Sequence, residues 1–446
     1  MGKLFGTDGI RGVANRELTP ELAFNIGRIA AWLLGREEVE PVFLIGRDTR
    51  LSGSMLEGSL MAGITSVGGM ARILGVASTP AVAYLTRELK ACAGIVISAS
   101  HNPIEDNGLK IFNSSGFKLS DKFEEKIEEI YFGDQGAVPR PEGVELGQAL
   151  IDGDALEIYL NHLKGSSASL DGLSLVVDCA HGAACRVAGE VLRDLGAEVK
   201  MLHDNPDGSL INVNCGATDT ADLQRSVKES GASAGLAFDG DADRLIAVDE
   251  KGAIVDGDAV MAICAVDMAG KGLLKNNTLV ATVMSNGGLD ILAEKEGFKV
   301  IRTTVGDRYV LEKMVEGSYN LGGEQSGHVI FSDYATTGDG LLTALQLLKV
   351  LQEKQRPLSE LASLIERLPQ VLVNRKVATK EGWSDNPKIK AAIEKVEEKL
   401  GRNGRVLIRP SGTEPKFRVM LEADLPEAQL EEYATEVAEV IVREQS

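Results

Sequence analysis

Short apolar runs alternate with amphipathic segments along most of the chain, and each kind of segment predicts an element. In the first part, apolar runs predict strands at 41–45, 71–74 and 93–97, and helical spacing predicts helices at 22–34, 55–67, 80–89 and from Ser120 onward. Thr19 and Pro20 are typical of a helix start, because threonine caps free N–H groups and proline fits the first turn. This alternation predicts an α/β unit with mostly parallel strands.

The same alternation recurs in two further stretches. The second unit has predicted strands at 173–177, 198–202 and 235–238 and helices at 183–195 and 221–229. The third begins with a helix near Gly257 and has strands at 279–283 and 300–303 and helices at 288–296 and 340–351. We infer three related α/β units, each with a polar loop at a strand end, where open sheets bind ligands.

The last part of the chain has a different pattern. Strands at 371–377, 405–408 and 417–421 and helices at 387–400 and 427–443 predict a small antiparallel α+β domain. The predicted fold is therefore α/β, with three related domains of mixed, mostly parallel sheets plus a C-terminal α+β domain around a central cleft. The predicted domains are 1–152, 153–254, 255–368 and 369–446, and the junction at 361–369 is a candidate hinge.

Length and charge exclude several classes of protein. The chain has 446 residues, which is too many for one core, and it has no apolar run long enough to span a bilayer. Its formal charge of −19 argues against nucleic acid and anionic membrane as partners, since both require a basic face. The N-terminus has no signal or transit pattern, so we expect a cytoplasmic protein.

The cysteines are odd in number and form no Cys-x-x-Cys pair. They are Cys92, Cys179, Cys185, Cys215 and Cys264. Because most of them flank apolar runs, we interpret them as reduced thiols in the core, in preference to disulfides or a zinc site.

Two polar loops directly follow buried strands and carry the candidate chemistry. Ser100 lies in SASHNP, residues 98–103, and DGDADR, residues 239–244, supplies Asp239, Asp241 and Asp243. Three carboxylates at alternating positions repel one another unless a hard cation such as Mg²⁺ lies between them. A serine facing such a cation suggests phosphoryl transfer.

Two more loops have compositions suited to a sugar phosphate. GGEQSGH, residues 322–328, places an acid, an amide, a hydroxyl and an imidazole on a glycine-rich turn, as expected for recognition of sugar hydroxyls. RPSGTEP, residues 409–415, combines a guanidinium, two hydroxyls and a glycine that lets backbone N–H groups approach an anion.

These residues fit three other kinds of site less well. A Ser-His-Asp hydrolase would use His101 as the base, but neighbours on an extended chain point to opposite sides, and no Gly-x-Ser-x-Gly elbow is present. An EF-hand would match the three aspartates and Glu250, but its sixth position, which must be glycine, is Arg244. An aspartyl-phosphate phosphatase would require a threonine that this loop lacks.

These loops, in this order, together with FGTDGIRG at residues 5–12, resemble the α-D-phosphohexomutase family over essentially the whole chain. Gln325 and the Gly412–Thr413 pair resemble its amino-sugar branch, whereas the sibling branches tend towards Met and an Asn-Thr pair. The resemblance implies that Ser100 is carried as phosphoserine. It also implies one Mg²⁺ per chain, held by the three aspartates and a phosphate oxygen on Ser100.

The resemblance assigns further roles to individual residues. Lys110 would stabilise the moving phosphoryl group or transfer a proton, Arg11 and Arg244 would add positive charge, and His101 would support the site or contact substrate. Substrate recognition is assigned to Glu324, Ser326, His328, Asp307 and Arg308, and phosphate binding to Arg409, Ser411, Gly412, Thr413 and Arg418. The family often has glycine at the position of Ala242, so we expect a slightly adjusted turn with intact ligands.

By this resemblance the chain interconverts glucosamine 6-phosphate and glucosamine 1-phosphate through bound glucosamine 1,6-bisphosphate, as a monomer or homodimer. The alternatives are a phosphomannomutase or phosphoglucomutase of the same family and, from another class, a non-catalytic sugar-phosphate sensor. A phosphorylated substrate must be held by local cations in a chain of this charge, and we expect these cations to converge on one cleft. They are Arg11, Arg47, Arg50, Lys110, Arg244, Arg302, Arg308, Arg409, Lys416 and Arg418.

Overall fold

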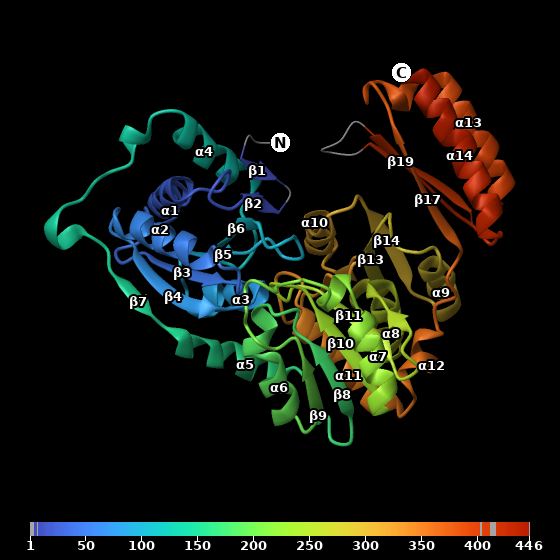
Figure 1. Cartoon of the computed structure of the whole chain (residues 1–446), viewed down its shortest axis with the longest axis horizontal. Helices are drawn as coiled ribbons and strands as arrows, with labels where there is room; N and C mark the ends of the chain where they lie inside the picture. The colour runs from blue at the N-terminus through green and yellow to red at the C-terminus, as the bar shows by residue number, and fades with distance from the viewer. Residues whose placement is uncertain (1–3, 7, 402–403, 411–415, 446) are drawn as a thin grey trace. The chain divides into compact units, whose positions relative to one another are not determined.

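A computed structural model describes residues 4–6, 8–401, 404–410 and 416–445. The chain forms two compact units (Figure 1). Unit 1 comprises Met1–Thr282 and Ile301–Leu364, and unit 2 comprises Val283–Val300 and Ile365–Ser446. None of the described helices is long and apolar enough to cross a membrane.

The first sheet has the strand order β1-β2-β6-β5-β3-β4-β7. Strands β3, β4, β5 and β7 are mutually parallel, whereas β6 runs antiparallel to β5 and to β2. The strands are β1 Phe5–Gly6, β2 Gly9–Val13, β3 Val42–Arg47, β4 Met70–Val76, β5 Ala93–Ile97, β6 Asp106–Asn113 and β7 Ala149–Ile151. The sequence did not predict β1, β2, β6 or β7, because the apolar runs there are short or broken by polar residues such as Asn107 and Lys110.

Helices cover both faces of this sheet. The helices are α1 Pro20–Leu34, α2 Gly53–Thr65, α3 Thr79–Glu88 and α4 Asp121–Phe132. Residues of α1, α2 and α4 pack in one core with Phe43 and Ile45 of β3. On the other face, Gly46 of β3 lies so close to Val82 of α3 that a Cβ atom there would come within 2.5 Å of the valine.

The second sheet has the order β12-β11-β10-β8-β9. Its strands are β8 Ser174–Asp178, β9 Glu198–Leu202, β10 Ala234–Phe238, β11 Leu245–Asp249 and β12 Ile254–Val255, with helices α5 Leu156–Gly165, α6 Ala188–Asp194 and α7 Ala221–Ser230. Strand β8 is parallel to both β9 and β10, whereas β11 is antiparallel to β10. The predicted helix at 183–195 is wrong as one element, because Val187, with φ −129°, separates a short 3₁₀ turn from α6.

The third sheet has the order β14-β13-β15-β16. Its strands are β13 Thr278–Thr282, β14 Lys299–Thr303, β15 Leu321–Gly323 and β16 Val329–Phe331. The helices of this part are α8 Gly257–Gly270, α9 Gly288–Glu296, α10 Asp307–Gly317, α11 Gly340–Lys354 and α12 Leu358–Ala362, of which the sequence did not predict α10 or α12. The GGEQSGH loop connects the antiparallel strands β15 and β16.

Unit 2 contains the last sheet, in the order β17-β19-β18, with both pairs antiparallel as predicted. Its elements are β17 Gln370–Lys376, β18 Arg405–Pro410, β19 Lys416–Glu422, α13 Pro387–Leu400 and α14 Glu427–Glu444. Figure 1 shows α13 and α14 together on one face of this sheet, where Ile389, Phe417 and Val437 share a core. The predicted fold class, α/β with mixed sheets and a C-terminal α+β domain, is confirmed. The predicted domain boundaries stay predictions.

Candidate active site

Ser100 lies just beyond the end of β5 in a conformation that the sequence did not predict. Its φ of 54° is in the left-handed region, which costs a non-glycine residue free energy and, at a buried polar site such as this one, is typical of functional residues. Its side chain is buried, and Oγ donates a hydrogen bond to Asp239 Oδ2 over 2.6 Å. The structure therefore brings the candidate nucleophile to the carboxylate loop 139 residues downstream.

Arg50 holds the serine loop in place through hydrogen bonds to its backbone carbonyl groups. Its guanidinium is fully buried, pairs with Asp48, and donates to the carbonyl oxygens of Ser100 at 3.0 Å and Asn102 at 2.8 Å. It also donates to the carbonyl of Pro103 and, over 3.0 Å, to that of Asp106. The expectation that Arg50 lines a cleft is wrong, because its charge is used to gather four carbonyl groups under the loop.

Asp239, Asp241 and Asp243 follow β10 and offer ligand atoms that lie within 4.8 Å of one another. Burial, together with the neighbouring carboxylates Asp243 and Asp241, raises the pKa of Asp239 to about 8. Asp241 Oδ1 and Asp243 Oδ1 are buried and have no hydrogen-bond partner among the described residues. Buried, unpaired carboxylate oxygens at this spacing suit a hard divalent cation such as Mg²⁺.

Lys110, on β6, is the main cation beside these carboxylates. Its Nζ lies 2.8 Å from Asp241 Oδ2 and 3.2 Å from Asp243 Oδ2, and it is 3.3 Å from Asp8. Burial alone would lower the pKa of this lysine, but Asp241, Asp8 and Asp243 together hold it well above its usual value. Lys110 is therefore a fixed positive charge in this structure.

Ala242, where the family often has glycine, also adopts the left-handed region, with φ 56°. The expected adjustment of the turn away from this conformation is wrong. The backbone is held there because Gly340 N donates to Ala242 O over 3.0 Å and Ala242 N donates to Asp239 O over 3.0 Å. The alanine accepts a strain of about 1–2 kcal/mol, and the carboxylates stay together.

His101 contacts the serine, and our reason for dismissing it as a base is wrong. His101 Nδ1 lies 3.2 Å from Ser100 Oγ. The argument assumed an extended chain, but the left-handed Ser100 turns the two side chains toward each other. Burial, then Arg244 and Arg11, lowers the pKa of His101 to about 4, so the imidazole is neutral near pH 7.

The two other predicted cations lie at the edges of the same cluster. Arg244 Nε is 3.9 Å from Asp239 and 3.7 Å from Asp243. Arg11 pairs with Asp8 and approaches Asn102 Oδ1 at 3.5 Å, next to the serine loop. Both side chains keep about a quarter of their surface exposed, so they are accessible to a ligand as well as to the carboxylates.

The GGEQSGH loop is attached directly to the carboxylate loop. Gly327 O accepts a hydrogen bond from Leu245 N over 3.0 Å, immediately after DGDADR. His328 is buried, with Nδ1 3.6 Å from Asp243 Oδ1 and Nε2 accepting from Gly338 N over 3.1 Å. Glu324 accepts from Gly306 N at 3.0 Å and from Ser326 Oγ at 3.3 Å.

Asp307 and Arg308, at the start of α10, have different surroundings. Asp307 lies 3.5 Å from His328 Nε2 and 2.6 Å from Lys118 Nζ, and Lys118 also pairs with Asp8. Arg308 pairs with carboxylates of Asp121 and Glu312, which lie on α4 and α10. The network from Asp8 through Lys118 and Asp307 to His328 was missed, because nothing in the sequence marks Lys118 as different from a surface lysine.

Of the predicted phosphate-binding residues, Arg409 and Arg418 lie directly opposite each other on the paired strands β18 and β19. The remaining three predicted positions, Ser411, Gly412 and Thr413, lie outside the described residues.

Comparison with known proteins identifies the family. Models of the phosphoglucomutase/phosphomannomutase family match the chain with alpha/beta/alpha domain I at residues 2–137, domain II at 157–252, domain III at 256–368 and the C-terminal domain at 372–440. Two relatives named phosphoglucosamine mutase are similar over nearly their whole length. The protein of Symbiobacterium thermophilum is 54% identical over 99% of both chains, and that of Geobacillus kaustophilus is 53% identical over 100% of this chain and 99% of its own.

Solved structures show the same fold at lower identity. A phosphoglucomutase/phosphomannomutase family protein from Burkholderia thailandensis has a TM-score of 0.81 at 24% identity, covering 98% of this chain and 96% of its own. The Aspergillus fumigatus N-acetylphosphoglucosamine mutase, in complex with GlcNAc-6P and magnesium, has a TM-score of 0.70 at 18% identity, covering 99% and 96%. The chain belongs to the phosphoglucomutase/phosphomannomutase family.

Proposed function

We propose that the chain is a phosphomutase that interconverts glucosamine 6-phosphate and glucosamine 1-phosphate through a phosphoserine at Ser100. The observation that carries this proposal is the contact of the Ser100 hydroxyl with Asp239, one of three buried carboxylates gathered at a single point. The name of the relatives at 54% and 53% identity selects the amino sugar over glucose or mannose. We place the enzyme in the cytoplasm, with a hexosamine phosphate as its small-molecule partner.

The proposed reaction consists of two phosphoryl transfers. In the first, the bond between phosphorus and Ser100 Oγ breaks while a bond to the 1-hydroxyl of glucosamine 6-phosphate forms, giving glucosamine 1,6-bisphosphate. The sugar then turns over, and its 6-phosphate returns to Ser100 Oγ. Glucosamine 1-phosphate leaves, and the phosphoserine is restored.

The residues of the chain supply orientation and charge for these transfers. Arg50 and the left-handed backbone fix the serine, so that little conformational entropy is lost as the transfer begins. Lys110 and Arg244 hold positive charge beside the carboxylates, where charge on the moving group must be stabilised. His101, which is neutral and lies 3.2 Å from Ser100 Oγ, would support the serine or contact the substrate.

One Mg²⁺ would be held by Asp239, Asp241 and Asp243 with an oxygen of the serine phosphate, and when bound it supplies charge that neutralises the transferring group. Glu324, Ser326 and His328 would bind the sugar hydroxyls, and Asp307 would position His328. Arg308 is the weaker candidate for substrate contact, because carboxylates already surround it. Arg409 and Arg418, with Ser411, Gly412 and Thr413, would bind the phosphate that is not reacting.

Substrate choice is tested by measuring turnover of the 6-phosphates of glucosamine, glucose and mannose side by side, with Mg²⁺ and a trace of bisphosphate. We expect kcat/KM for glucosamine 6-phosphate to exceed the other two by at least about tenfold, since a lost hydrogen bond to the amino group costs about 1.4 kcal/mol or more. A preference for glucose or mannose would move the chain to a sibling activity, and tight binding with no turnover of any sugar would make it a sensor.

A further inference from the structure

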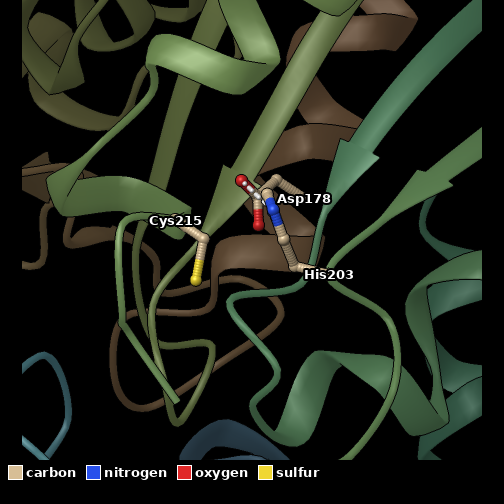
Figure 2. Close-up of side chains that lie close together, drawn as sticks. All are labelled: Asp178, His203 and Cys215. Atoms are coloured by element: carbon tan, nitrogen blue, oxygen red, sulfur yellow. Dashed lines mark ion pairs between the residues drawn. The ribbon is translucent and has the colours of Figure 1, made fainter. Parts of the chain in front are cut away.

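A second cluster of metal-ligating side chains lies where three loops of the second sheet meet. Asp178 is the last residue of β8, His203 follows β9 directly, and Cys215 lies in the loop before α7. Figure 2 shows the Asp178 carboxylate beside the His203 ring, with Cys215 next to them, and one ligand atom from each lies within 4.8 Å of the other two. A carboxylate oxygen, an imidazole nitrogen and a thiol sulfur are donors that zinc and its neighbours in the periodic table bind well.

The cluster is buried but can be reached from solvent. Asp178 and Cys215 have no exposed surface, whereas the side chain of His203 is 22% exposed. The carboxylate of Asp178 is fixed by two backbone groups, since Ala180 N donates to Oδ1 over 2.9 Å and Gly216 N donates to Oδ2 over 3.0 Å. Outer hydrogen bonds of this kind orient the ligands of a metal.

The placement of His203 is the observation that points to a ligand. Its Nδ1 lies 3.0 Å from Asp178 Oδ2, yet this buried atom forms no hydrogen bond with any described residue. Two donors on one zinc ion, each about 2.0–2.2 Å from it, approach each other to about 3 Å without a hydrogen bond between them. On the other side of the ring, Nε2 lies 3.6 Å from Asp222 Oδ2. The imidazole of His203 therefore lies between two carboxylates, with Nδ1 on the side of the cluster.

We propose that Asp178, His203 and Cys215 bind a divalent transition metal of the zinc class, separate from the Mg²⁺ site of the aspartate triad. The sequence analysis disfavoured a zinc site because the cysteines form no Cys-x-x-Cys pair and most of them flank apolar runs. The metal would tie together the ends of β8 and β9 and the loop before α7. That loop also carries Asn212, whose side-chain amide donates to Ser100 O over 2.9 Å, so the second site adjoins the support of the serine loop.

The test is a titration of the full-length protein with Co²⁺, in excess Mg²⁺ so that the aspartate triad is occupied. We expect a near-ultraviolet thiolate-to-cobalt charge-transfer band that saturates at about one Co²⁺ per chain and is displaced by Zn²⁺. Only a site with a sulfur ligand gives this band, so oxygen-only sites do not contribute. Absence of the band at one equivalent, or a band that appears only in large excess, would overturn the proposal and favour a simple ion pair between His203 and Asp178.

Variants identify which thiol is used. Cys215→Ser should lose the band, whereas Cys185→Ser, a thiol 3.7 Å from the His203 carbonyl, and Cys264→Ser, a buried thiol in α8, should keep it. A band that persists in Cys215→Ser would contradict the assignment. His203→Gln should also lose the band, although it keeps every thiol. Loss of the band in both variants would not be explained by misfolding of Cys215→Ser alone. Asp222→Asn should weaken Co²⁺ binding about 10- to 100-fold, as loss of an outer-shell carboxylate does.

Discussion

The loops that follow β8 and β10 start from equivalent places in one sheet, since the two strands are parallel and Ala237 pairs with Asp178. The loop after β10 gathers three carboxylates, whereas Asp178, the last residue of β8, contributes one carboxylate to a cluster with an imidazole and a thiol. Both loops contain an alanine in the left-handed region, Ala242 and Ala180. The difference teaches that the donor atoms, rather than the backbone, decide the class of metal: oxygens alone suit Mg²⁺, and mixed donors suit zinc.

The two clusters also differ in how their negative charge is balanced. In the triad, Lys110 is inserted between Asp241 and Asp243, and two carboxylate oxygens still lack a hydrogen bond. In the second cluster, two backbone N–H groups donate to the single carboxylate, and His203 Nδ1 lies 3.0 Å from it. A cation is therefore more strongly required at the triad. Loss of charge balance at the triad should affect activity and stability more than the same loss at the second cluster.

The largest effect should come from removing the nucleophile. Ser100→Ala should lower the turnover of glucosamine 6-phosphate by at least about 10⁴-fold, because the hydroxyl proposed to carry the phosphoryl group is removed. The measurement is formation of glucosamine 1-phosphate in a coupled assay, and Ser115→Ala, at an exposed turn near β6, is the matched control. The Co²⁺ band should be unchanged in Ser100→Ala. Turnover within tenfold of the wild type would contradict the assignment of the reaction to Ser100 and the aspartate triad.

Removing the buried cation should have the next largest effect. Lys110→Met should lower the free energy of unfolding by about 3–5 kcal/mol, because Asp241 and Asp243 are left as uncompensated buried charges. Mg²⁺ should then stabilise the variant more than it stabilises the wild type. Urea denaturation with and without Mg²⁺ measures both quantities. Lys164→Met, at a more exposed ion pair with Asp194, should cost only about 0–1 kcal/mol. Equal Mg²⁺ responses in Lys110→Met and the wild type would argue against a cation at the triad.

A smaller effect tests the left-handed alanine in the triad loop. Ala242→Gly should be close to neutral, since relief of about 1–2 kcal/mol of backbone strain offsets the lost methyl group and the freedom gained by the unfolded chain. Ala247→Gly, equally buried in β11, has no strain to relieve and should destabilise by about 1–2 kcal/mol. Thermal denaturation compares the two variants. Equal losses of stability in Ala242→Gly and Ala247→Gly would mean that the turn at Ala242 is not strained.

The smallest effect concerns Glu124, a half-buried carboxylate of α4 that belongs to neither cluster. Burial raises its pKa to about 7, although Arg308 acts in the opposite direction. The folded chain therefore holds a proton that the unfolded chain releases near pH 4.5, so this group's contribution to stability is present below that pH and is lost as the pH rises to 7. Glu124→Gln should lose less stability than the wild type between pH 5 and 8. The exposed control Glu125→Gln should show the same dependence of unfolding free energy on pH as the wild type. If Glu124→Gln also showed that dependence, the raised pKa of Glu124 would be refuted.

The parts of the fold that were predictable were those with local patterns. Strand β5 has the predicted bounds, and β10 begins one residue before its predicted start, because both are uninterrupted apolar runs. Strand β6 was missed because its polar residues point to buried polar partners from distant loops, as Lys110 does. The same limit applies to Arg50, whose partners are backbone carbonyls that no side-chain pattern reveals.

The candidate site was predictable as a set of motifs but not as a geometry. Grouping Ser100 with the aspartates required only the strand ends and the chemistry of carboxylates. The position of His101 depended on the backbone of Ser100, and an extended chain was the wrong assumption for a strained residue. The second cluster was hidden for a related reason, because its members are far apart in sequence and converge only through the order of β10, β8 and β9.

The central claim is that the hydroxyl beside Asp239 carries the phosphoryl group and passes it to the sugar. It is tested most directly with enzyme labelled by ³²P-bisphosphate, digested and mapped by mass spectrometry before and after a single turnover with unlabelled glucosamine 6-phosphate and Mg²⁺. The account predicts label on the peptide containing Ser100 and its transfer to the sugar within one turnover. Label on another residue, or label on Ser100 that stays there while product forms, would contradict it.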